Sequence, residues 1–497
     1  MINNISFLLL FATANLLSQN FLTPLQKSNY TKITSHDKLS QFLKEVDEVS
    51  DLITSEVIAE SVEGRELYAV HFSKSEFGKD ASKIRILIFA QQHGNEQSGK
   101  EGSLQLINEL LKTENQYLFD KIDFALVPQM NPDGSDKNQR RNGNDMDLNR
   151  NHLILTEPET IGLHRLFNKY LFEVTMDVHE YYPYSEGWIK YGYVKNFDEQ
   201  IGSSTNPNVS KEIRDLSNRY YFPFIKKCLN KKDFSFNNYI LGGPPELELI
   251  RHSTFDINDG RQSMGIQNTF SFIQEGKNGK DSLDNIERRS EGQMTGMMGL
   301  LVFSYNHKDE IKNLVNSERE KLVKNEIANN VAIQLDHFSD GSKLELPLKS
   351  YYSDKDTFVT VNDYRPVVKS LFDVERPKGY LVPKLIKELV EWADRHSLTY
   401  YDYKKSDEDK IEQYYITGID SMDFERDIIV NPIVEVKEIP NDLSDVDYIF
   451  IPVNQLKNNT IVIALEPKSE LGIVTYKNFE HLLKKGENFP ILRVVNN

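Results

Sequence analysis

A histidine and a carboxylate stand close together just after an apolar run. The run covers residues 84–90, and His93-Gly94-Asn95-Glu96 follows it. A short run rich in β-branched and aromatic residues predicts a buried strand, and open α/β sheets bind ligands beyond the carboxyl ends of their strands. Imidazole nitrogen and carboxylate oxygen are ligands that suit Zn²⁺. His93 and Glu96 are therefore candidate metal ligands.

The same spacing also occurs where no metal is expected. The chain has 11 histidines, and His307 and Glu310 form a second His-x-x-Glu pair in a charged run behind a segment with helical periodicity. His93 differs in its context, because a strand precedes it and a helix-like segment, 103–111, follows it. His307 thus serves as an internal comparison for His93.

Two further strand-like segments end in residues that suit a hydrolytic site. Residues 172–179 end at His179, and residues 268–274 lead into Glu275. A His/Glu/His ligand set leaves a fourth position open for water, which is typical of catalytic zinc, and hydrolysis then needs a base to take the proton of that water. We predict Glu275 as the base, with Glu180 as the next choice. Taken singly, His179 is equally typical of a core histidine and Glu275 of a solvated strand end.

An arginine-containing loop lies between these strands. Asn131-Pro132-Asp133-Gly134 has the composition of a turn, and the segment 140–150, with the sequence RRNGNDMDLNR, follows it. Guanidinium groups match carboxylates bidentately and can stabilise a developing oxyanion. The loop therefore suits a carboxylate-bearing substrate, although its charges alone are also typical of a solvated surface.

In order and in type, these segments resemble the zinc carboxypeptidases related to carboxypeptidase A. That family has His-x-x-Glu, then Asn-Pro-Asp-Gly, then Arg followed ten residues on by the end of Asp-x-Asn-Arg, then a strand-end His and a strand-end Glu. Every element is present here, and residues 61–68 resemble the family's early hairpin. The resemblance spans roughly residues 39–305 and implies an α/β fold with a mixed sheet flanked by helices.

The resemblance also implies a role for each motif residue. It implies that one Zn²⁺ per chain is bound by His93, Glu96 and His179, and that Glu275 is the general base and acid. Residues of the arginine-containing loop would bind substrate: Arg140 would polarise the scissile carbonyl, with Arg141 as the fallback, and Asn149 and Arg150 would hold the terminal carboxylate. Asp147 would hydrogen-bond His93 and fix its tautomer.

The chain departs from the family where substrate side chains are recognised. Digestive members carry a Tyr shortly before the catalytic Glu, whereas the stretch between Ile240 and Glu275 contains no Tyr. Asn95 stands where those members have an Arg, and the charged segment 251–261 fills the region instead. The side-chain preference therefore stays open.

Composition favours a large folded enzyme. The chain has 497 residues, 39% of them hydrophobic and 27% charged, which is enough for a large core and two or three domains. A net charge of -16 argues against binding to nucleic acid or to anionic membranes. The single cysteine, Cys228, excludes an internal disulfide.

The chain is predicted to have four parts. Residues 1–20 are predicted to be a signal peptide, because 5–17 is apolar but too short to span a membrane and Ala12-Thr13-Ala14 offers a cleavage site. Residues 21–305 would form the catalytic domain and the charged segment 306–330 a helical connector. Residues 331–497 would form a mostly β accessory domain.

Within the last part the periodicity predicts individual elements. Strands are predicted at 357–361, 427–430, 448–453 and 460–465, and a helix at 384–396. We expect this part to pack on the catalytic cleft or to shape it.

The sequence thus predicts an exported zinc metallocarboxypeptidase. Its partner would be a peptide with a free C-terminal carboxylate, and the mature chain would have no membrane span. Two alternatives stay open at this point: a zinc amidase acting on cell-wall peptides or another carboxylate-bearing amide, and a non-catalytic peptide-binding protein.

Overall fold

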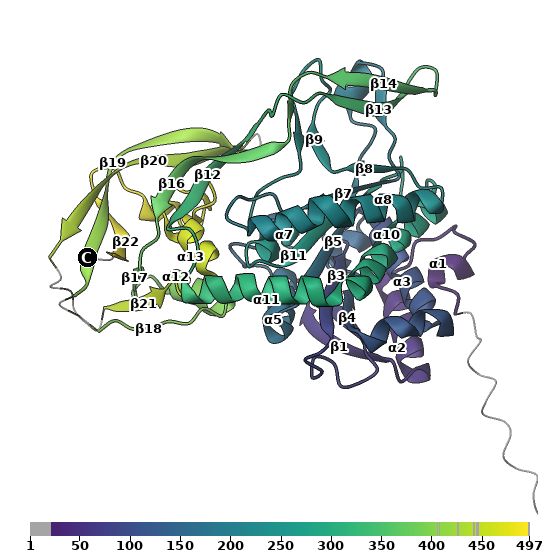
Figure 1. Cartoon of the computed structure of the whole chain (residues 1–497), viewed down its shortest axis with the longest axis horizontal. Coiled ribbons are helices and arrows are strands. Elements are labelled where there is room, and N and C mark those ends of the chain that lie inside the picture. The colour runs from purple at the N-terminus through teal and green to yellow at the C-terminus, as the bar shows by residue number, and fades with distance from the viewer. Residues whose placement is uncertain are drawn as a thin grey trace, which may run out of the picture.

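A computed structural model describes residues 21–404, 406, 408–424, 427–440, 443 and 447–495. The predicted signal peptide lies outside these residues. At the centre is an eight-stranded mixed sheet with the order β1-β2-β4-β3-β5-β11-β7-β8 (Figure 1). Its strands are β1 (Ile53–Glu60), β2 (Glu66–Phe72), β3 (Ile84–Ala90), β4 (Ile122–Val127), β5 (Val174–Tyr181), β7 (Glu199–Ser203), β8 (Phe236–Asn238) and β11 (Phe270–Lys277).

Helices cover both faces of this sheet. On β3, Ile86 and Ile88 belong to the core shared with α3 (Gln97–Leu111), α8 (Phe222–Lys231) and α10 (Ile286–Asn306). Leu87 and Phe89 belong to a second core on the opposite face, shared with α5 (Pro158–Tyr170) and α9 (Gly260–Gly265). Successive strand residues point to opposite faces, so a strand covered on both sides is apolar throughout. This explains why residues 86–90 are all apolar, and it confirms the expected mixed sheet flanked by helices.

The strands that carry His179 and Glu275, and the strand that precedes His93, are neighbours in the sheet. β5 pairs in parallel with β3 on one side and with β11 on the other. Parallel strands end at the same edge of a sheet, so the segments that follow β3, β5 and β11 meet there. The sheet therefore brings together residues far apart in the sequence.

Further helices frame the sheet. They are α1 (Pro24–Lys27), α2 (His36–Val49), α4 (Pro132–Asp136), α6 (Glu186–Lys190), α7 (Lys211–Leu216) and α11 (Lys308–Lys324). α11 lies within the segment predicted as a helical connector and buries Ile311, Val315 and Leu322. Among the described residues, no helix is both long and apolar enough to cross a membrane.

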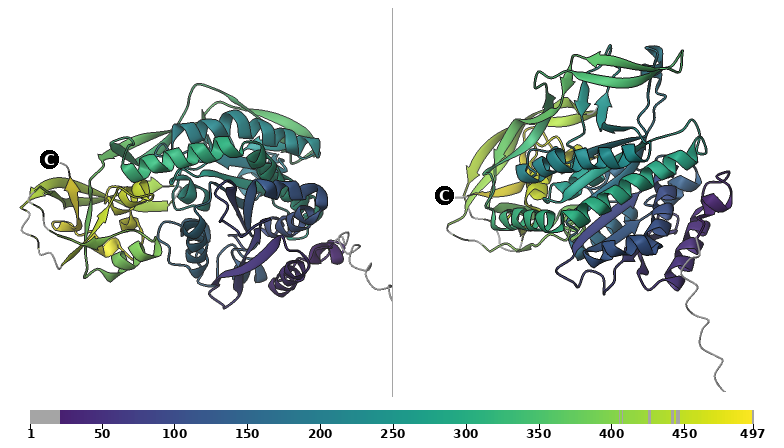
Figure 2. Two further views of the ribbon diagram at one scale, coloured as in Figure 1. Left: turned by 60° about the horizontal axis from the view of Figure 1, so that its bottom comes forward. Right: turned by 45° about the vertical axis from the view of Figure 1, so that its right-hand side comes forward.

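The C-terminal part, coloured green to yellow in Figure 2, is dominated by a six-stranded sheet. Its strand order is β18-β21-β17-β22-β19-β20. Its strands are β17 (Gly379–Pro383), β18 (Tyr401–Asp402), β19 (Lys410–Phe424), β20 (Asp427–Ile439), β21 (Tyr448–Pro452) and β22 (Asn488–Val495), with helix α12 (Lys387–Arg395) against it. The predicted strand 460–465 is wrong: Asn458–Leu465 forms α13, all of whose residues are buried. A short apolar run does not distinguish a buried strand from a buried helix.

Smaller sheets join the two halves of the chain. β13 (Leu344–Ser350) pairs with β14 (Asp356–Val361) and with β6 (Tyr193–Lys195). β10 (Ile250–His252) pairs with β9 (Ile240–Gly242) and with β15 (Tyr364–Arg365), while β12 (Asn330–Phe338) pairs with β16 (Val367–Glu375). Strands from both halves thus share sheets, and the domain limits proposed from sequence stay a prediction.

Candidate metal centre and active site

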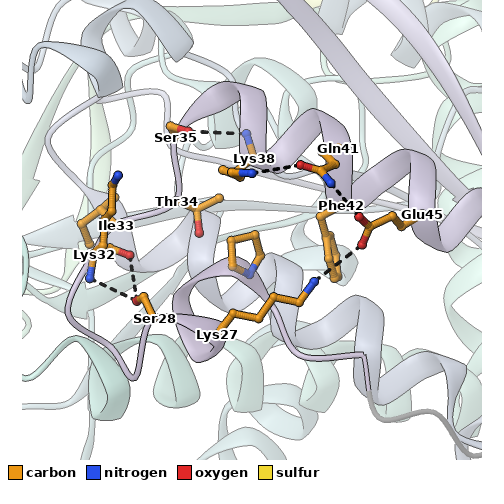
Figure 3. Close-up of a pocket in the computed structure, with 11 residues that line it drawn as sticks. Lys27, Ser28, Lys32, Ile33, Thr34, Ser35, Lys38, Gln41, Phe42 and Glu45 are labelled. Carbon is orange, nitrogen blue, oxygen red and sulfur yellow. Dashed lines mark hydrogen bonds and ion pairs between the residues drawn. The ribbon is translucent and has the colours of Figure 1, made fainter.

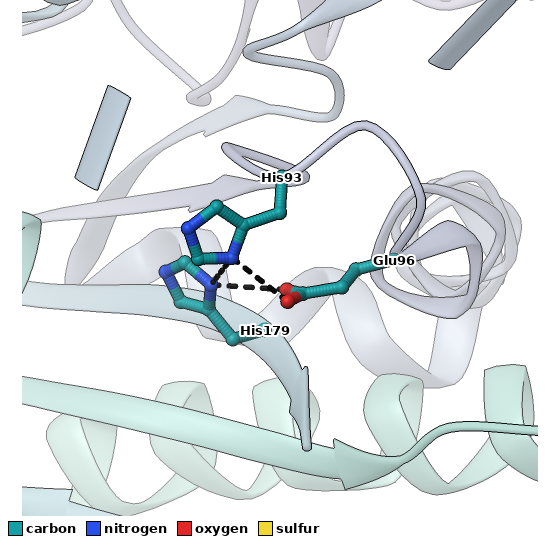
Figure 4. Close-up of side chains that lie close together, drawn as sticks. All are labelled: His93, Glu96 and His179. Atoms are coloured by element: carbon teal, nitrogen blue, oxygen red, sulfur yellow. Dashed lines mark hydrogen bonds and ion pairs between the residues drawn. The ribbon is translucent and has the colours of Figure 1, made fainter. Parts of the chain in front are cut away.

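His93, Glu96 and His179 converge at the edge where β3, β5 and β11 end (Figure 4). The Nδ1 atoms of the two histidines lie 3.1 Å apart, and each is close to a different oxygen of Glu96, at 2.8 Å from His93 and 3.0 Å from His179. All three side chains are buried. The geometry therefore brings together the three ligands expected from the sequence.

This cluster suits a tetrahedral metal ion. Ligand atoms bound to zinc at about 2.0–2.1 Å in a tetrahedron are separated by about 3.3 Å, close to the spacing of the three atoms here. Two imidazole lone pairs and a carboxylate facing one another repel unless a cation or protons lie between them. The donor set of two nitrogens and one oxygen is that of catalytic zinc sites with an open position.

Each histidine is held from behind by a carboxylate. Asp147 Oδ1 lies 3.2 Å from His93 Nε2, and Asp177 Oδ1 lies 2.8 Å from His179 Nε2. A carboxylate at Nε2 favours the proton there and leaves the Nδ1 lone pair for the metal. Burial disfavours the charged imidazole of His179, but Asp177 and Glu96 outweigh it and raise its pKa well above the usual value. The site thus attracts positive charge.

Glu275 lies directly beside His179. The two residues are register partners on the parallel strands β11 and β5. Burial raises the pKa of Glu275 to about 7; the neighbouring histidines oppose this shift and Glu96 adds to it. A carboxyl group whose pKa is near neutral can both accept and release a proton at physiological pH. β5 and β11 continue for two residues beyond His179 and Glu275, so both residues lie within strand ends rather than after them.

Of the two candidate arginines, only Arg140 faces the cluster. Its Nη1 lies 3.2 Å from His93 Nδ1, and its Nε donates to Asp147 Oδ2 at 2.9 Å. Arg141 instead donates to the backbone oxygen of Asp145 at 2.8 Å, away from the cluster. Arg140 is therefore the arginine that lies beside the candidate metal ligands, and its role toward a substrate carbonyl stays a prediction.

Asn149 and Arg150 lie next to this group. Both belong to a short 3₁₀ turn, Leu148–Arg150, whose N-cap Asp147 accepts from the backbone N–H of Asn149. The Oδ1 of Asn149 accepts from Gln92 Nε2 at 3.2 Å and from the backbone N–H of Gly260 at 2.8 Å. Arg150 is exposed. The turn thus links the predicted carboxylate-binding pair to the residue that orients His93.

The loops that carry these residues touch at a glycine. A Cβ added at Gly94 would lie 2.1 Å from the backbone carbon of Gly134, so only glycine permits this approach. The side chain of Asn131 caps α4 and donates to the backbone oxygens of Gln92 and Arg140, at 3.0 and 3.2 Å. The predicted turn at 131–134 is therefore the start of a short helix that fixes both loops.

The second His-x-x-Glu pair, His307 and Glu310, and the alternative base Glu180 form contacts outside the metal-ligand cluster. His307 Nδ1 and Glu310 Oε2 do lie 3.0 Å apart, but in the described part of the chain only His93, Glu96 and His179 form a group of three or more possible metal ligands. Glu180 is buried and forms an ion pair with Arg289 at 2.8 Å. Strand context, rather than spacing, distinguishes the two His-x-x-Glu pairs.

Three residues that support the cluster were not predicted from the sequence. Asp177 and Gln92 are buried, and Gln92 Nε2 donates to Asp177 Oδ2 at 2.8 Å. Gln293 on α10 donates to the backbone oxygen of His179 at 2.7 Å. One signal was available: a carboxylate two residues before His179 in an apolar strand points to the same face as the histidine. Nothing local indicated Gln92 or Gln293.

A hollow of about 440 Å³ between α1 and α2 contains none of these residues (Figure 3). Among its polar and charged lining residues, Lys27 forms an ion pair with Glu45, and Lys38 donates to Gln41. The chemistry of the chain therefore lies at the sheet edge and not in this hollow.

Known proteins match this chain over the same region. Residues 39–221 match the family model described as zinc carboxypeptidase. Carboxypeptidase 2 of Trichophyton tonsurans is 24% identical over 455 residues, which cover 87% of this chain and 81% of that protein. Carboxypeptidase D of Mus musculus is 28% identical over 221 residues, covering 37% of this chain and 16% of that protein.

Solved structures of metallo-carboxypeptidases are also similar. That from Burkholderia cenocepacia has a TM-score of 0.42 and 19% identity, covering 55% of this chain and 70% of its own. That from Pseudomonas aeruginosa has a TM-score of 0.43 and 19% identity, covering 57% and 71%. The family match and the curated relatives confirm the resemblance of the motifs to the zinc carboxypeptidases, a family of hydrolytic enzymes, whose model residues 39–221 match.

Proposed function

We propose that this protein is a zinc-dependent metallocarboxypeptidase that removes C-terminal residues from peptides, with His93, Glu96 and His179 as the ligands of one zinc ion. The observation that supports this most is the approach of the two Nδ1 atoms and the Glu96 carboxylate, with Glu275 in register beside His179. Zinc bound there would lower the pKa of a coordinated water to about 7 and polarise a substrate carbonyl.

In this proposal Glu275 moves the proton. Its carboxylate takes a proton from the attacking water and then gives it to the nitrogen of the leaving residue. The pKa of about 7 produced by burial suits both transfers, because a group that titrates near the working pH is efficient in either direction. Glu180 is unsuited to this role, since Arg289 holds its carboxylate.

The arginines bind the two charged parts of the reacting peptide. Arg140, held by Asp147, donates to the carbonyl oxygen as negative charge develops on it. Arg150 and Asn149 bind the terminal carboxylate, whose planar shape matches a guanidinium fork. Burial raises the pKa of Tyr476 to about 12, while Asn258 and Arg150 oppose this shift, so a residue of the C-terminal part lies near the carboxylate site.

Free and amidated peptides test the proposal. Amidation removes the terminal negative charge that the guanidinium of Arg150 would bind. The free acid should be trimmed one residue at a time and much faster than its amide, as followed by mass spectrometry, and Arg150→Ala should abolish the difference. Equal cleavage of acid and amide, or internal cleavage, would contradict the carboxypeptidase proposal.

The same assay addresses the other functions. A zinc amidase would cleave cell-wall peptides in preference to ordinary peptides of equal length, and a binding protein would retain peptides without cleaving them. Export remains part of the proposal, and N-terminal sequencing of the protein recovered outside the producing cell would test it, since the expected signal peptide lies outside the described residues.

A further inference from the structure

Lys195 lies close to Glu275 without being its ion-pair partner. It is the last residue of β6 and is partly buried, with its Nζ 5.2 Å from the centre of the Trp188 ring and 6.0 Å from that of Tyr181. Burial lowers the pKa of Lys195 to about 8, and the charge of Glu275 opposes this shift. The side chain is therefore mostly charged at neutral pH. In the described part of the chain, no carboxylate forms an ion pair with it.

The C-terminal part of the chain holds this lysine in place. Lys195 is the register partner of Leu348 on β13, and Val194 is the partner of Lys349. Trp188, beneath the ammonium group, packs in one apolar cluster with Leu346 and Leu348 of the same strand. The lysine is thus fixed on an aromatic support rather than extended into solvent.

Lys195 and the predicted carboxylate site contact different elements around the catalytic residues. The contacts of Lys195 are with Tyr181, the last residue of β5, and with Trp188 on α6. The contacts of Asn149 are with Gln92 and Gly260, which follow β3 and begin α9. If the leaving residue binds at Asn149 and Arg150, the residue on the acyl side of the scissile bond lies toward Lys195.

An acidic side chain on the acyl side would otherwise be unfavourable. Glu275 and Glu96 lie close to each other in the candidate site, and the whole chain has a net charge of -16. A substrate carboxylate there is therefore repelled unless a cation faces it. A partly desolvated ammonium with no protein carboxylate bound to it offers that cation, and burial strengthens such an interaction relative to water.

We propose that Lys195 is a specificity-determining residue that binds the side-chain carboxylate of an Asp or Glu immediately before the scissile bond. This inference rests on the carboxypeptidase proposal and adds to it a substrate class, peptides with an acidic penultimate residue.

Matched peptide pairs test the inference. Two peptides that differ only in Glu or Gln at the penultimate position are assayed with the zinc-loaded enzyme, and the ratio of their kcat/KM values is compared between variants. The wild-type ratio should favour Glu by about tenfold to a hundredfold, as for one charged hydrogen bond. Lys195→Met should bring the ratio near one, whereas Lys195→Arg should keep most of it. Rising salt should lower the wild-type ratio in part, because the Lys195 side chain is only partly buried.

The exposed Lys190 on α6 provides a matched control, because Lys190→Met removes the same charge nearby and should leave the ratio unchanged. A wild-type ratio near one, or a ratio that survives Lys195→Met, would overturn the inference while cleavage of both peptides still supports a carboxypeptidase. If neither free-acid peptide is cleaved, the carboxypeptidase proposal itself fails, and this inference fails with it.

Discussion

Asp177→Asn tests whether the residues behind the cluster set its metal affinity. Asp177 is buried, with Oδ1 2.8 Å from His179 Nε2 and Oδ2 accepting from Gln92 Nε2 at 2.8 Å. In both contacts an oxygen of Asp177 is the acceptor. An asparagine has one oxygen and one NH₂ group, so at one of the two contacts its NH₂ group would face another donor.

Rotating the Gln92 amide cannot remove this clash of two donors without breaking other hydrogen bonds. Its Oε1 accepts from His152 Nε2 at 2.7 Å, and its Nε2 also donates to Asn149. Turning the Gln92 amide would break these contacts. If the new NH₂ group faces His179 instead, it favours the tautomer with the proton on Nδ1, the atom needed for the metal.

We therefore expect Asp177→Asn to weaken zinc binding by about 10- to 100-fold, or about 1.4–2.7 kcal/mol, the usual cost of losing a carboxylate behind a metal-binding histidine. The assay is competition with a chromophoric chelator at fixed pH, with circular dichroism of the metal-free protein as a check on folding. Asp145→Asn removes a carboxylate whose side chain is 88% exposed and should leave the affinity unchanged. Affinity of Asp177→Asn within about threefold of wild type would refute the reasoning.

Three other perturbations have defined outcomes. Glu275→Gln should retain zinc but lower kcat by about 10²–10⁴, and near-normal turnover would exclude Glu275 as the base. His179→Ala should lose most of its zinc by elemental analysis while His307→Ala keeps it; equal zinc in both would contradict the ligand set. Burial raises the pKa of Glu159 to about 7, so the folded protein keeps a proton that the unfolded chain loses from pH 4.5 upward, and the free energy of unfolding falls between pH 4.5 and 7. In urea titrations Glu159→Gln should flatten this fall by up to a few kcal/mol, whereas the exposed Glu76→Gln should not, and unchanged slopes would contradict the assignment.

The cluster could be anticipated because its residues follow local signals. His93, His179 and Glu275 each come at the end of an apolar run, and runs of that kind form parallel neighbours whose ends meet. His307 does not end such a strand-like run, because its segment has helical and charged character. Short-range patterns, taken together with the resemblance of the ordered motifs to the zinc carboxypeptidases, therefore predicted the central sheet and the residues that converge on its edge.

What the sequence did not predict depends on contacts between distant segments. Lys195 gains its position from pairing with β13, more than 150 residues further on. The run 460–465 forms a helix because its surroundings bury it on all sides, a condition that its apolar composition alone does not define. Asp177, which lies behind His179, is held by Gln92, and Gln92 meets Asp177 and His152 only in the folded chain.

The backbone oxygen of Leu153 joins the segment after Arg150 to the C-terminal part of the chain. It accepts from Trp392 Nε1 at 2.9 Å and from His396 Nε2 at 2.7 Å, and it lies three residues after Arg150. One continuous core also runs from the helices of the central sheet to Trp392 and α13. The C-terminal part therefore braces the segment that follows Arg150. If Arg150 binds the terminal carboxylate of the substrate as proposed, weakening this brace should impair carboxylate binding before it impairs metal binding.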